Sequence, residues 1–158
     1  MSKLFGEFDC KLDAKGRLMV PAMLKKKLPD VEREGLMICR GFENSLIIYP
    51  MKVWEKMEER LEDVNYFQKD GRGFLRSMLR GLTELSLDAA GRVLLPKTLL
   101  DHAGITSELV LVGQLDKIEV WDKATYEAPP IPVQKLYLHD LIMFSAAKHD
   151  QQHQETIQ

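Results

Sequence analysis

Apolar and polar residues alternate in two short stretches near the start of the chain, at 8–12 and 18–20. Side chains with a period of two point to opposite faces of a β-strand, so each stretch predicts a half-buried strand. Asp13-Ala14-Lys15-Gly16 lies between them and has the composition of a tight turn, with an acceptor side chain first and glycine last. The pattern predicts a hairpin, followed at Pro21 by a short basic helix over 22–28.

Longer periods appear in the middle of the chain. Residues 36–49 are apolar and β-branched and are interrupted by the turn 41–44, which predicts a second hairpin. From 53 to 64 the apolar residues recur at the spacing of an amphipathic helix, and a second such stripe covers 74–82. The glycine-containing residues 65–73 between the two helices are expected to form a loop.

The same order of elements then begins again. Leu12-Asp13-Ala14-Lys15-Gly16-Arg17 recurs as Leu87-Asp88-Ala89-Ala90-Gly91-Arg92, and a proline follows each copy at the same distance, Pro21 and Pro96. Residues 84–121 accordingly predict a second set of strand, turn, strand, short helix and hairpin. Two long matches in register with a downstream proline identify the chain as a tandem repeat.

The repeat divides the chain into four predicted parts. Residues 7–54 form the first repeat, 55–82 a helical connector, 83–126 the second repeat and 127–158 a proline-linked C-terminal tail. An extra stretch around 30–35 in the first repeat is expected to be a surface loop, where insertions are tolerated. Because units this small bury too little apolar surface to be stable alone, the copies are predicted to interlock their strands in one shared pseudo-dimeric barrel of the α+β class.

Composition bounds the class of protein. The 158 residues are 45% hydrophobic and 29% charged, as in soluble globular proteins. The apolar runs are far shorter than the roughly 20 residues of a membrane span, and acidic residues come too early for a secretory signal, so a cytosolic protein without membrane association is expected. Cys10 and Cys39 lack the C-x-x-C spacing of a zinc site and are predicted to be small buried apolar residues.

The charge is unevenly distributed. A net charge of −2 argues by itself against nucleic-acid binding. Residues 1–27, however, are locally basic, with cations well in excess of acids. The cations are Lys3, Lys11, Lys15, Arg17, Lys25, Lys26 and Lys27, and the acids are Glu7, Asp9 and Asp13.

A turn with an arginine at its exit has two interpretations. A two-stranded ribbon fits the major groove of DNA, where Arg17 could pair with guanine or with a phosphate and Lys11 and Lys15 could neutralise phosphates. Alternatively, Asp13 and Arg17 pair across the turn and only stabilise it. The second copy keeps the turn but loses both lysines, so we expect the first copy to be the main DNA-contacting edge and Arg92 to contribute less.

The paired motifs, together with Ser45-Leu46-Ile47-Ile48-Tyr49-Pro50 and the stretch 113–121, resemble the MraZ family over residues 1–128. The resemblance implies two AbrB-like swapped-hairpin units with short flanking helices. It also implies a ring-shaped homo-oligomer that regulates transcription by binding repeated double-stranded DNA elements upstream of the cell-division and cell-wall gene cluster, as a nucleoid-associated protein. The expected DNA-binding residues are then Lys11, Asp13, Lys15, Gly16 and Arg17, with Arg92 as a lesser contact. The expected structural residues of the turns are Asp88, Gly91, Pro21 and Pro96. If a ring presents one such turn from each subunit to DNA, the DNA elements should lie about one helical turn, roughly 10 bp, apart.

Two other functions stay open beside DNA-binding regulation. One is a swapped-hairpin antitoxin with a toxin-binding tail, and the other is an oligomeric protein that modulates an enzyme. Arg72, Arg76 and Arg80 on the second connector helix could contact DNA, water or the acidic helix at 55–63 of the same or a neighbouring subunit, with pairing favoured.

No residues indicate catalysis, and no metal, cofactor or small-molecule substrate is expected. His149 and His153 have the spacing of a metalloprotease helix but lie in a polar tail, where solvation is expected. His102 and His139 are predicted to be structural. Pro129-Pro130-Ile131-Pro132 predicts a stiff linker, and the residues after it a short helix.

Overall fold

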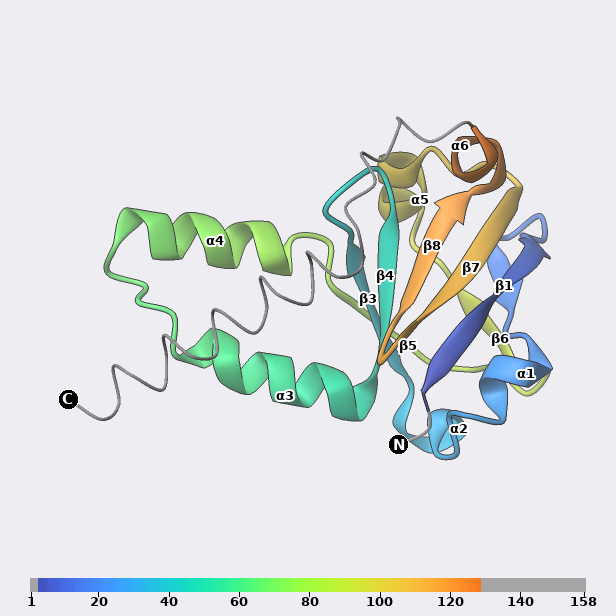
Figure 1. Ribbon diagram of the computed structural model, residues 1–158, viewed down its shortest axis with the longest axis horizontal. Coiled ribbons are helices and arrows are strands. Elements are labelled where there is room, and N and C mark those ends of the chain that lie inside the picture. The colour runs from blue at the N-terminus through green and yellow to red at the C-terminus, as the bar shows by residue number, and fades with distance from the viewer. Residues whose placement is uncertain (1–2, 129–158) are drawn as a thin grey trace, which may run out of the picture. The chain divides into compact units, whose positions relative to one another are not determined.

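The computed structural model describes residues 3–128, which form antiparallel sheets and helices of the predicted α+β class (Figure 1). The strands are β1 (Leu4–Lys11), β2 (Arg17–Met19), β3 (Leu36–Arg40), β4 (Leu46–Pro50), β5 (Thr83–Leu85), β6 (Arg92–Leu94), β7 (Glu108–Leu115) and β8 (Ile118–Asp122). The helices are α1 (Ala22–Lys25), α2 (Val31–Glu34), α3 (Met51–Glu62), α4 (Lys69–Leu79), α5 (Lys97–Ala103) and α6 (Lys123–Glu127). The expectations for the proline linker, the tail helix, His139, His149 and His153 concern residues outside this described part.

The strands of the two repeats interleave. β1 of the first repeat pairs with β7 of the second, β3 pairs with β5, β2 with β6 and β4 with β8, all antiparallel. The predicted pairing of 8–12 with 18–20 was therefore wrong, although the turn between them forms. The period of two identifies a half-buried strand but not its partner, and an isolated two-stranded hairpin is only marginally stable.

The pairings follow an approximate twofold relation between the repeats. Leu18 of β2 faces Val93 of β6, and these two residues occupy the same position in the repeated motif. Arg17 faces Leu94, and Met19 faces Arg92. Because alternate residues of a strand share a face, both arginines lie on the face of the ribbon opposite to the buried Leu18 and Val93.

The predicted closed barrel does not form within the described residues. Six strands make one sheet in the order β1-β7-β8-β4-β3-β5, and β2 and β6 make a separate two-stranded ribbon. These two strands have only three residues each and pair with each other instead of bridging β1 to β5, so the sheet stays open. Leu18 and Val93 of the ribbon belong to the same apolar core as Ile38 and Leu109 of the sheet, which fixes the ribbon over one sheet face.

The connector helices differ from the prediction in their bounds. α3 packs through Trp54 on a second apolar core with Cys39, Ile47 and Tyr49. α4 begins at Lys69, so part of the predicted loop is helical. Its first turn is tied back to the preceding residues, because Arg72 Nη1 donates to the carbonyl oxygens of Tyr66 and Phe67, each at 3.2 Å.

The predicted loop at 30–35 contains the short helix α2. Val31 anchors α2 in the main core with 4% of its surface exposed. Gly35 ends the helix at φ +75°, and a Cβ there would lie 2.6 Å from the carbonyl oxygen of Leu85. Glycine is therefore required where the chain enters β3 beside β5.

The two cysteines occupy different environments. Cys39 is buried, as predicted, whereas Cys10 is half-buried. Burial raises the pKa of both thiols to about 11, so both are protonated at neutral pH. In the part of the chain that the structure describes, no helix has the length and apolar character to cross a membrane.

Candidate nucleic-acid interface

The first repeated turn is held together by the carboxylate of Asp13. Its Oδ1 accepts hydrogen bonds from the backbone N–H groups of Lys15 and Arg17, both at 2.9 Å. Its Oδ2 accepts from Nε of Arg17 at 2.6 Å. The turn closes with Gly16 at φ +82°, a conformation that favours glycine. One side chain therefore shapes the turn and orients the guanidinium at its exit.

The second turn repeats this geometry. Asp88 Oδ1 accepts from the backbone N–H groups of Ala90 and Arg92, and Oδ2 accepts from Nε of Arg92, all at 2.9 Å. Gly91 has φ +83°. Pro21 and Pro96 directly precede α1 and α5, where a fixed φ near −60° starts a helix without loss of a backbone hydrogen bond.

Both aspartates are stabilised in their ionised form. The backbone N–H of Arg17 lowers the pKa of Asp13 most, and its guanidinium and the N–H of Lys15 also contribute. Arg92 lowers the pKa of Asp88 in the same way. The interpretation in which aspartate and arginine pair across the turn thus describes part of the geometry. This pairing uses Nε and leaves donors on the Nη atoms of each guanidinium for another acceptor.

The interleaved fold brings the two turns to one ribbon. The N–H of Val20 donates to the carbonyl oxygen of Gly91 at 3.1 Å, and the N–H of Leu95 donates to that of Gly16 at 3.1 Å. Arg92 Nη1 lies 3.8 Å from Asp13 Oδ2, which links the second motif to the first. Arg92, which the sequence assigned to a mainly structural copy, therefore shares one surface with Arg17.

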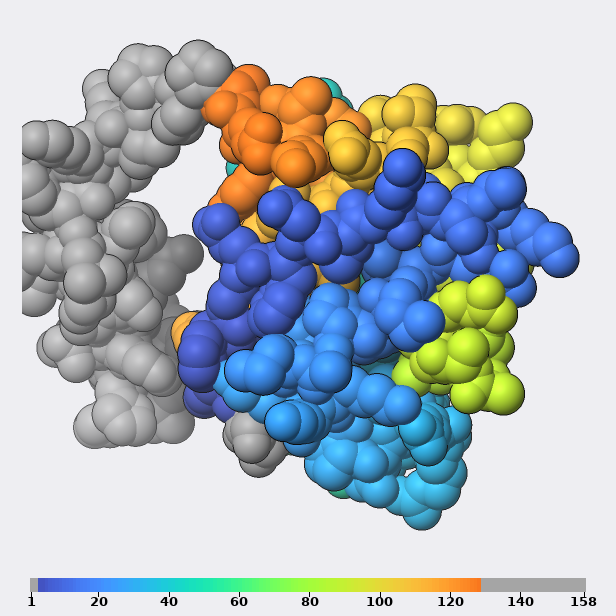
Figure 2. All heavy atoms as spheres, turned by 90° about the vertical axis from the view of Figure 1, so that its right-hand side faces the viewer, coloured from blue at the N-terminus to red at the C-terminus, as the bar shows by residue number. Residues whose placement is uncertain are grey.

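This surface is exposed and combines cations with apolar side chains. Met19 is 51% exposed and Leu94 58%, and each faces an arginine across the ribbon. Lys11 and Lys15 are also exposed. Figure 2 shows the yellow-green atoms of the second turn beside blue atoms of the first repeat on this side of the molecule. We define the ribbon face as Arg17, Met19, Arg92 and Leu94.

The three lysines after Pro21 have different environments. Lys25 pairs with Glu32, with Nζ and Oε1 2.7 Å apart, and its Nζ would lie 3.7 Å from a Cβ at Gly91. A lysine of the first repeat thus stands beside the turn of the second, a contact that sequence spacing cannot reveal. Lys27 Nζ lies 3.2 Å from the centre of the Phe5 ring, a cation–π contact, whereas Lys26 is exposed.

The arginines of α4 were expected to pair with the acidic helix. Among residues 3–128, no ion pair joins Arg72, Arg76 or Arg80 to an acidic residue of α3. Arg72 instead donates hydrogen bonds to backbone carbonyl groups. Pairing with a neighbouring subunit stays a prediction. No group of three or more His, Cys, Asp or Glu residues suited to a metal ion occurs in this same region.

Comparison with known proteins agrees with the repeat. The family model described as "MraZ protein, putative antitoxin-like" matches residues 4–77 and again 78–129. The chain is 42% identical over 128 residues to the Transcriptional regulator MraZ of Christiangramia forsetii, which covers 80% of this chain and 83% of the relative.

Two further relatives carry the same name. The one from Flavobacterium psychrophilum is 40% identical over 128 residues, or 80% of this chain and 82% of its own. The one from Cytophaga hutchinsonii is 36% identical over 122 residues, or 77% of this chain and 81% of its own. Since a two-part family match spans most of the described residues and several relatives align over most of both chains, the chain belongs to the MraZ family.

Proposed function

We propose that this chain is a DNA-binding transcriptional regulator whose ribbon face contacts double-stranded DNA. The observation that carries the proposal is that both D-x-x-G-R turns place their arginines on one exposed two-stranded ribbon. The relatives are named transcriptional regulators, which supports the same function and agrees with the expectation that the chain is not an enzyme.

The ribbon has the shape and chemistry for groove binding. A two-stranded ribbon fits the major groove of B-DNA, and an arginine can donate two hydrogen bonds to O6 and N7 of guanine. Met19 and Leu94, which face the arginines across the ribbon, could make apolar contacts with thymine methyl groups. Lys11 and Lys15 flank the ribbon from the first repeat, where they would neutralise phosphates.

The two arginines are not equivalent, and we infer that Arg17 contributes more to binding. Arg17 is paired with one carboxylate, that of Asp13. Arg92 lies between two, with Nε 2.9 Å from Asp88 Oδ2 and Nη1 3.8 Å from Asp13 Oδ2. Its charge is therefore more fully neutralised within the protein. In addition, the second repeat has Ala90 at the position of Lys15, so Arg92 lacks the neighbouring lysine that Arg17 has.

A gel-shift titration of single variants tests this division. Arg17→Ala should abolish operator binding, whereas Arg92→Ala should retain most of it. Arg60→Ala on α3 is the matched control and should bind as the wild type does. It removes an exposed arginine that is neither part of the ribbon face nor among the residues that line the groove between α3 and α4. Equal losses for Arg17→Ala and Arg92→Ala, with thermal denaturation showing that both are folded, would contradict the inference.

Specific binding is proposed to require several protomers. One ribbon with a few cations gives only modest affinity, on the order of 10⁻⁴–10⁻⁶ M for non-specific contacts. A ring-shaped homo-oligomer that engages repeated elements would raise the effective concentration of each ribbon face at the DNA, with a gain in affinity of about 10²–10⁴. Elements about 10 bp apart would face the same side of the duplex. Wild-type affinity that is unaffected by a half-turn change in spacing would count against this arrangement.

The connector helices are the proposed contact between protomers. Phe74 of α4 is 49% exposed and Leu79 is 44% exposed, and no α4 side chain is fully buried in the described protomer. A groove between α3 and α4 is lined by apolar residues, among them Trp54 and Leu75, and by glutamates, among them Glu58. Phe74→Ser with Leu79→Ser should reduce the oligomer mass measured by light scattering, and an unchanged mass would exclude this contact.

The genomic target and cellular place are part of the proposal. We place the binding sites upstream of the cell-division and cell-wall gene cluster and the protein in the cytoplasm at the nucleoid. The description of the family as antitoxin-like keeps a second function open. Co-purification with a small toxic partner would favour that function, whereas DNA recovered without such a partner would favour regulation.

A further inference from the structure

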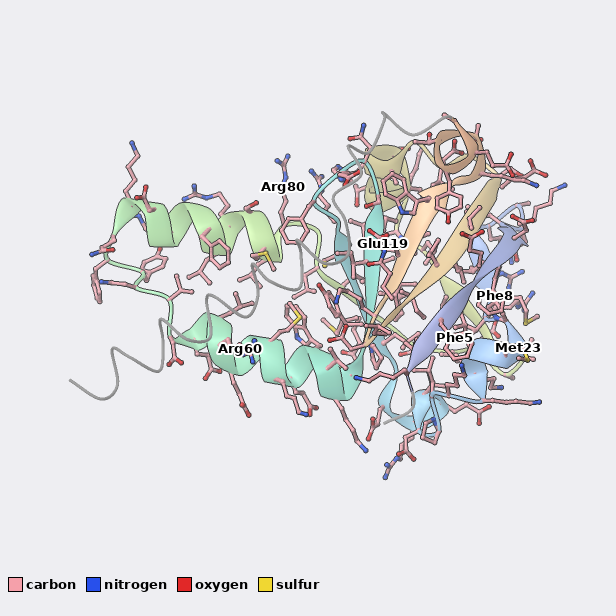
Figure 3. All side chains as sticks on the ribbon, in the orientation of Figure 1. Phe5, Phe8, Met23, Arg60, Arg80 and Glu119 are labelled. Atoms are coloured by element: carbon pink, nitrogen blue, oxygen red, sulfur yellow. The ribbon has the colours of Figure 1, made fainter. Side chains whose placement is uncertain are left out.

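A second group of cations lies outside the ribbon face. The cations are Arg40 at the end of β3 and Arg76 and Arg80 of the α4 region, which line one open groove of about 700 Å³ together with His102 of α5. Gly41 after β3 and Gly73, Ser77 and Leu79 of α4 also line it, and no acidic residue is among the lining residues of the described chain. Arg80 extends from the end of α4 on the side away from α3 (Figure 3). Several cations therefore converge without a carboxylate to neutralise them.

Two buried nitrogen atoms in this groove lack a partner. Nε of Arg40 and Nε2 of His102 are shielded from solvent and have no hydrogen bond within residues 3–128. An unpaired buried polar atom is costly, so a native protein usually supplies it with a partner or uses it for a ligand. Arg76 and Arg80 line the same groove and are exposed, so their guanidinium groups are accessible to an oxygen-rich ligand.

The fold itself does not require these residues. Arg40 faces Leu46 across the β3–β4 hairpin, whereas the corresponding position in the second repeat is Val112, which faces Glu119. His102 corresponds in the repeated sequence to Lys27, which instead lies over the Phe5 ring. The cationic groove is therefore built on one side only of an otherwise repeated structure.

We infer that this groove binds the phosphate group of a small anionic ligand. Guanidinium groups donate in a planar fork that matches the several acceptor oxygens of a phosphate, and charge-assisted bonds of this kind are stronger than neutral ones. Ser77 adds a hydroxyl donor, and Gly73 leaves open space beside the helix, since a Cβ there would meet nothing within 4 Å. The volume is in the range of small-molecule sites, so the group can be free phosphate or a phosphate ester.

Titration calorimetry of the full chain without DNA tests the site. The probes are inorganic phosphate and glycerol 1-phosphate, each compared with sodium chloride at equal ionic strength. Saturable binding of one probe per protomer is expected, and the tighter probe distinguishes free phosphate from an ester. Arg40→Gln and Arg76→Gln should each weaken binding at least about tenfold, because each removes a charge-assisted donor. Arg60→Gln on α3 should leave it unchanged.

Three results would overturn the inference. The first is no saturable binding of either probe to the wild type, and the second is equal binding by Arg76→Gln and the wild type. The third is a change in oligomer mass in Arg76→Gln with phosphate affinity intact, which would assign the groove to a neighbouring subunit. Arg76 is exposed on α4, so its substitution keeps the test valid even if Arg40→Gln does not fold. Since no DNA is present, failure here is separate from failure of the regulatory function.

Discussion

The pairing of β2 with β6 makes a quantitative prediction about stability. Leu18 and Val93 face each other across the ribbon, and each is only 1% exposed. Leu18→Ala removes a fully buried side chain and should cost about 2–5 kcal/mol in free energy of unfolding. Val93→Ala removes two carbon atoms, one fewer than Leu18→Ala, and should cost about 2–3 kcal/mol.

The double variant separates interleaved repeats from independent hairpins. Because the two side chains face each other in the same core, the losses of unfolding free energy caused by Leu18→Ala and Val93→Ala should not add. The expected interaction energy is about 1 kcal/mol or more. Urea denaturation followed by tryptophan fluorescence measures each cost, at one protomer concentration because the chain is expected to oligomerise. The control pairs Leu18→Ala with Cys39→Ala, since Cys39 is buried in the other core and its cost should add within about 0.5 kcal/mol. Additivity in the Leu18 and Val93 cycle would refute the interleaved ribbon.

Three further predictions concern the turns. Because hydrogen bonds from Arg17 and Arg92 lower the pKa of Asp13 and Asp88, their stabilisation is present above the ordinary aspartate pKa and is lost as pH falls through the lower folded pKa. The Asp13→Asn, Asp88→Asn variant should therefore lose less stability than the wild type between about pH 5 and pH 2, and an equal loss would be inconsistent with this reasoning. Gly91→Ala should cost about 1–2 kcal/mol in denaturant unfolding because of φ +83°, whereas Gly73→Ala, in open helical space, should cost nothing, and similar costs would argue against strain at the turn. Lys15→Gln should reduce the slope of log affinity for DNA against log salt by about 0.9 per engaged protomer, and an unchanged slope would remove Lys15 from the phosphate contacts.

Local structure was predictable from the sequence where the type of a single residue determines the backbone conformation. The turn at Asp13 needs an acceptor at its first position and a positive φ at Gly16, and both are written in the residue types. The apolar stripe that predicts α3 likewise contains Trp54, which is buried. In α4 the glycines at 71 and 73 suggested a loop, but Arg72 binds the preceding carbonyl groups and the helix starts earlier.

Long-range choices were not predictable. The alternation in 8–12 is satisfied equally by a hairpin and by pairing with β7, and only burial over both repeats selects the second. The same choice places Arg92 near Asp13 and Lys25 beside Gly91. The cationic groove at Arg40 also depends on three elements that are distant in sequence. Sites formed by interleaving strands require the pairing before they can be recognised.

Selection of bound sequences from random duplex DNA tests the central claim, that ribbon faces of several protomers read repeated DNA elements. The full-length protein is incubated with the pool at about 150 mM salt, where non-specific phosphate contacts are weakened. The account predicts enrichment of direct repeats about 10 bp apart, and loss of that enrichment in Arg17→Ala. Recovery of unenriched sequences by the wild type, or of the same repeats by Arg17→Ala, would contradict it.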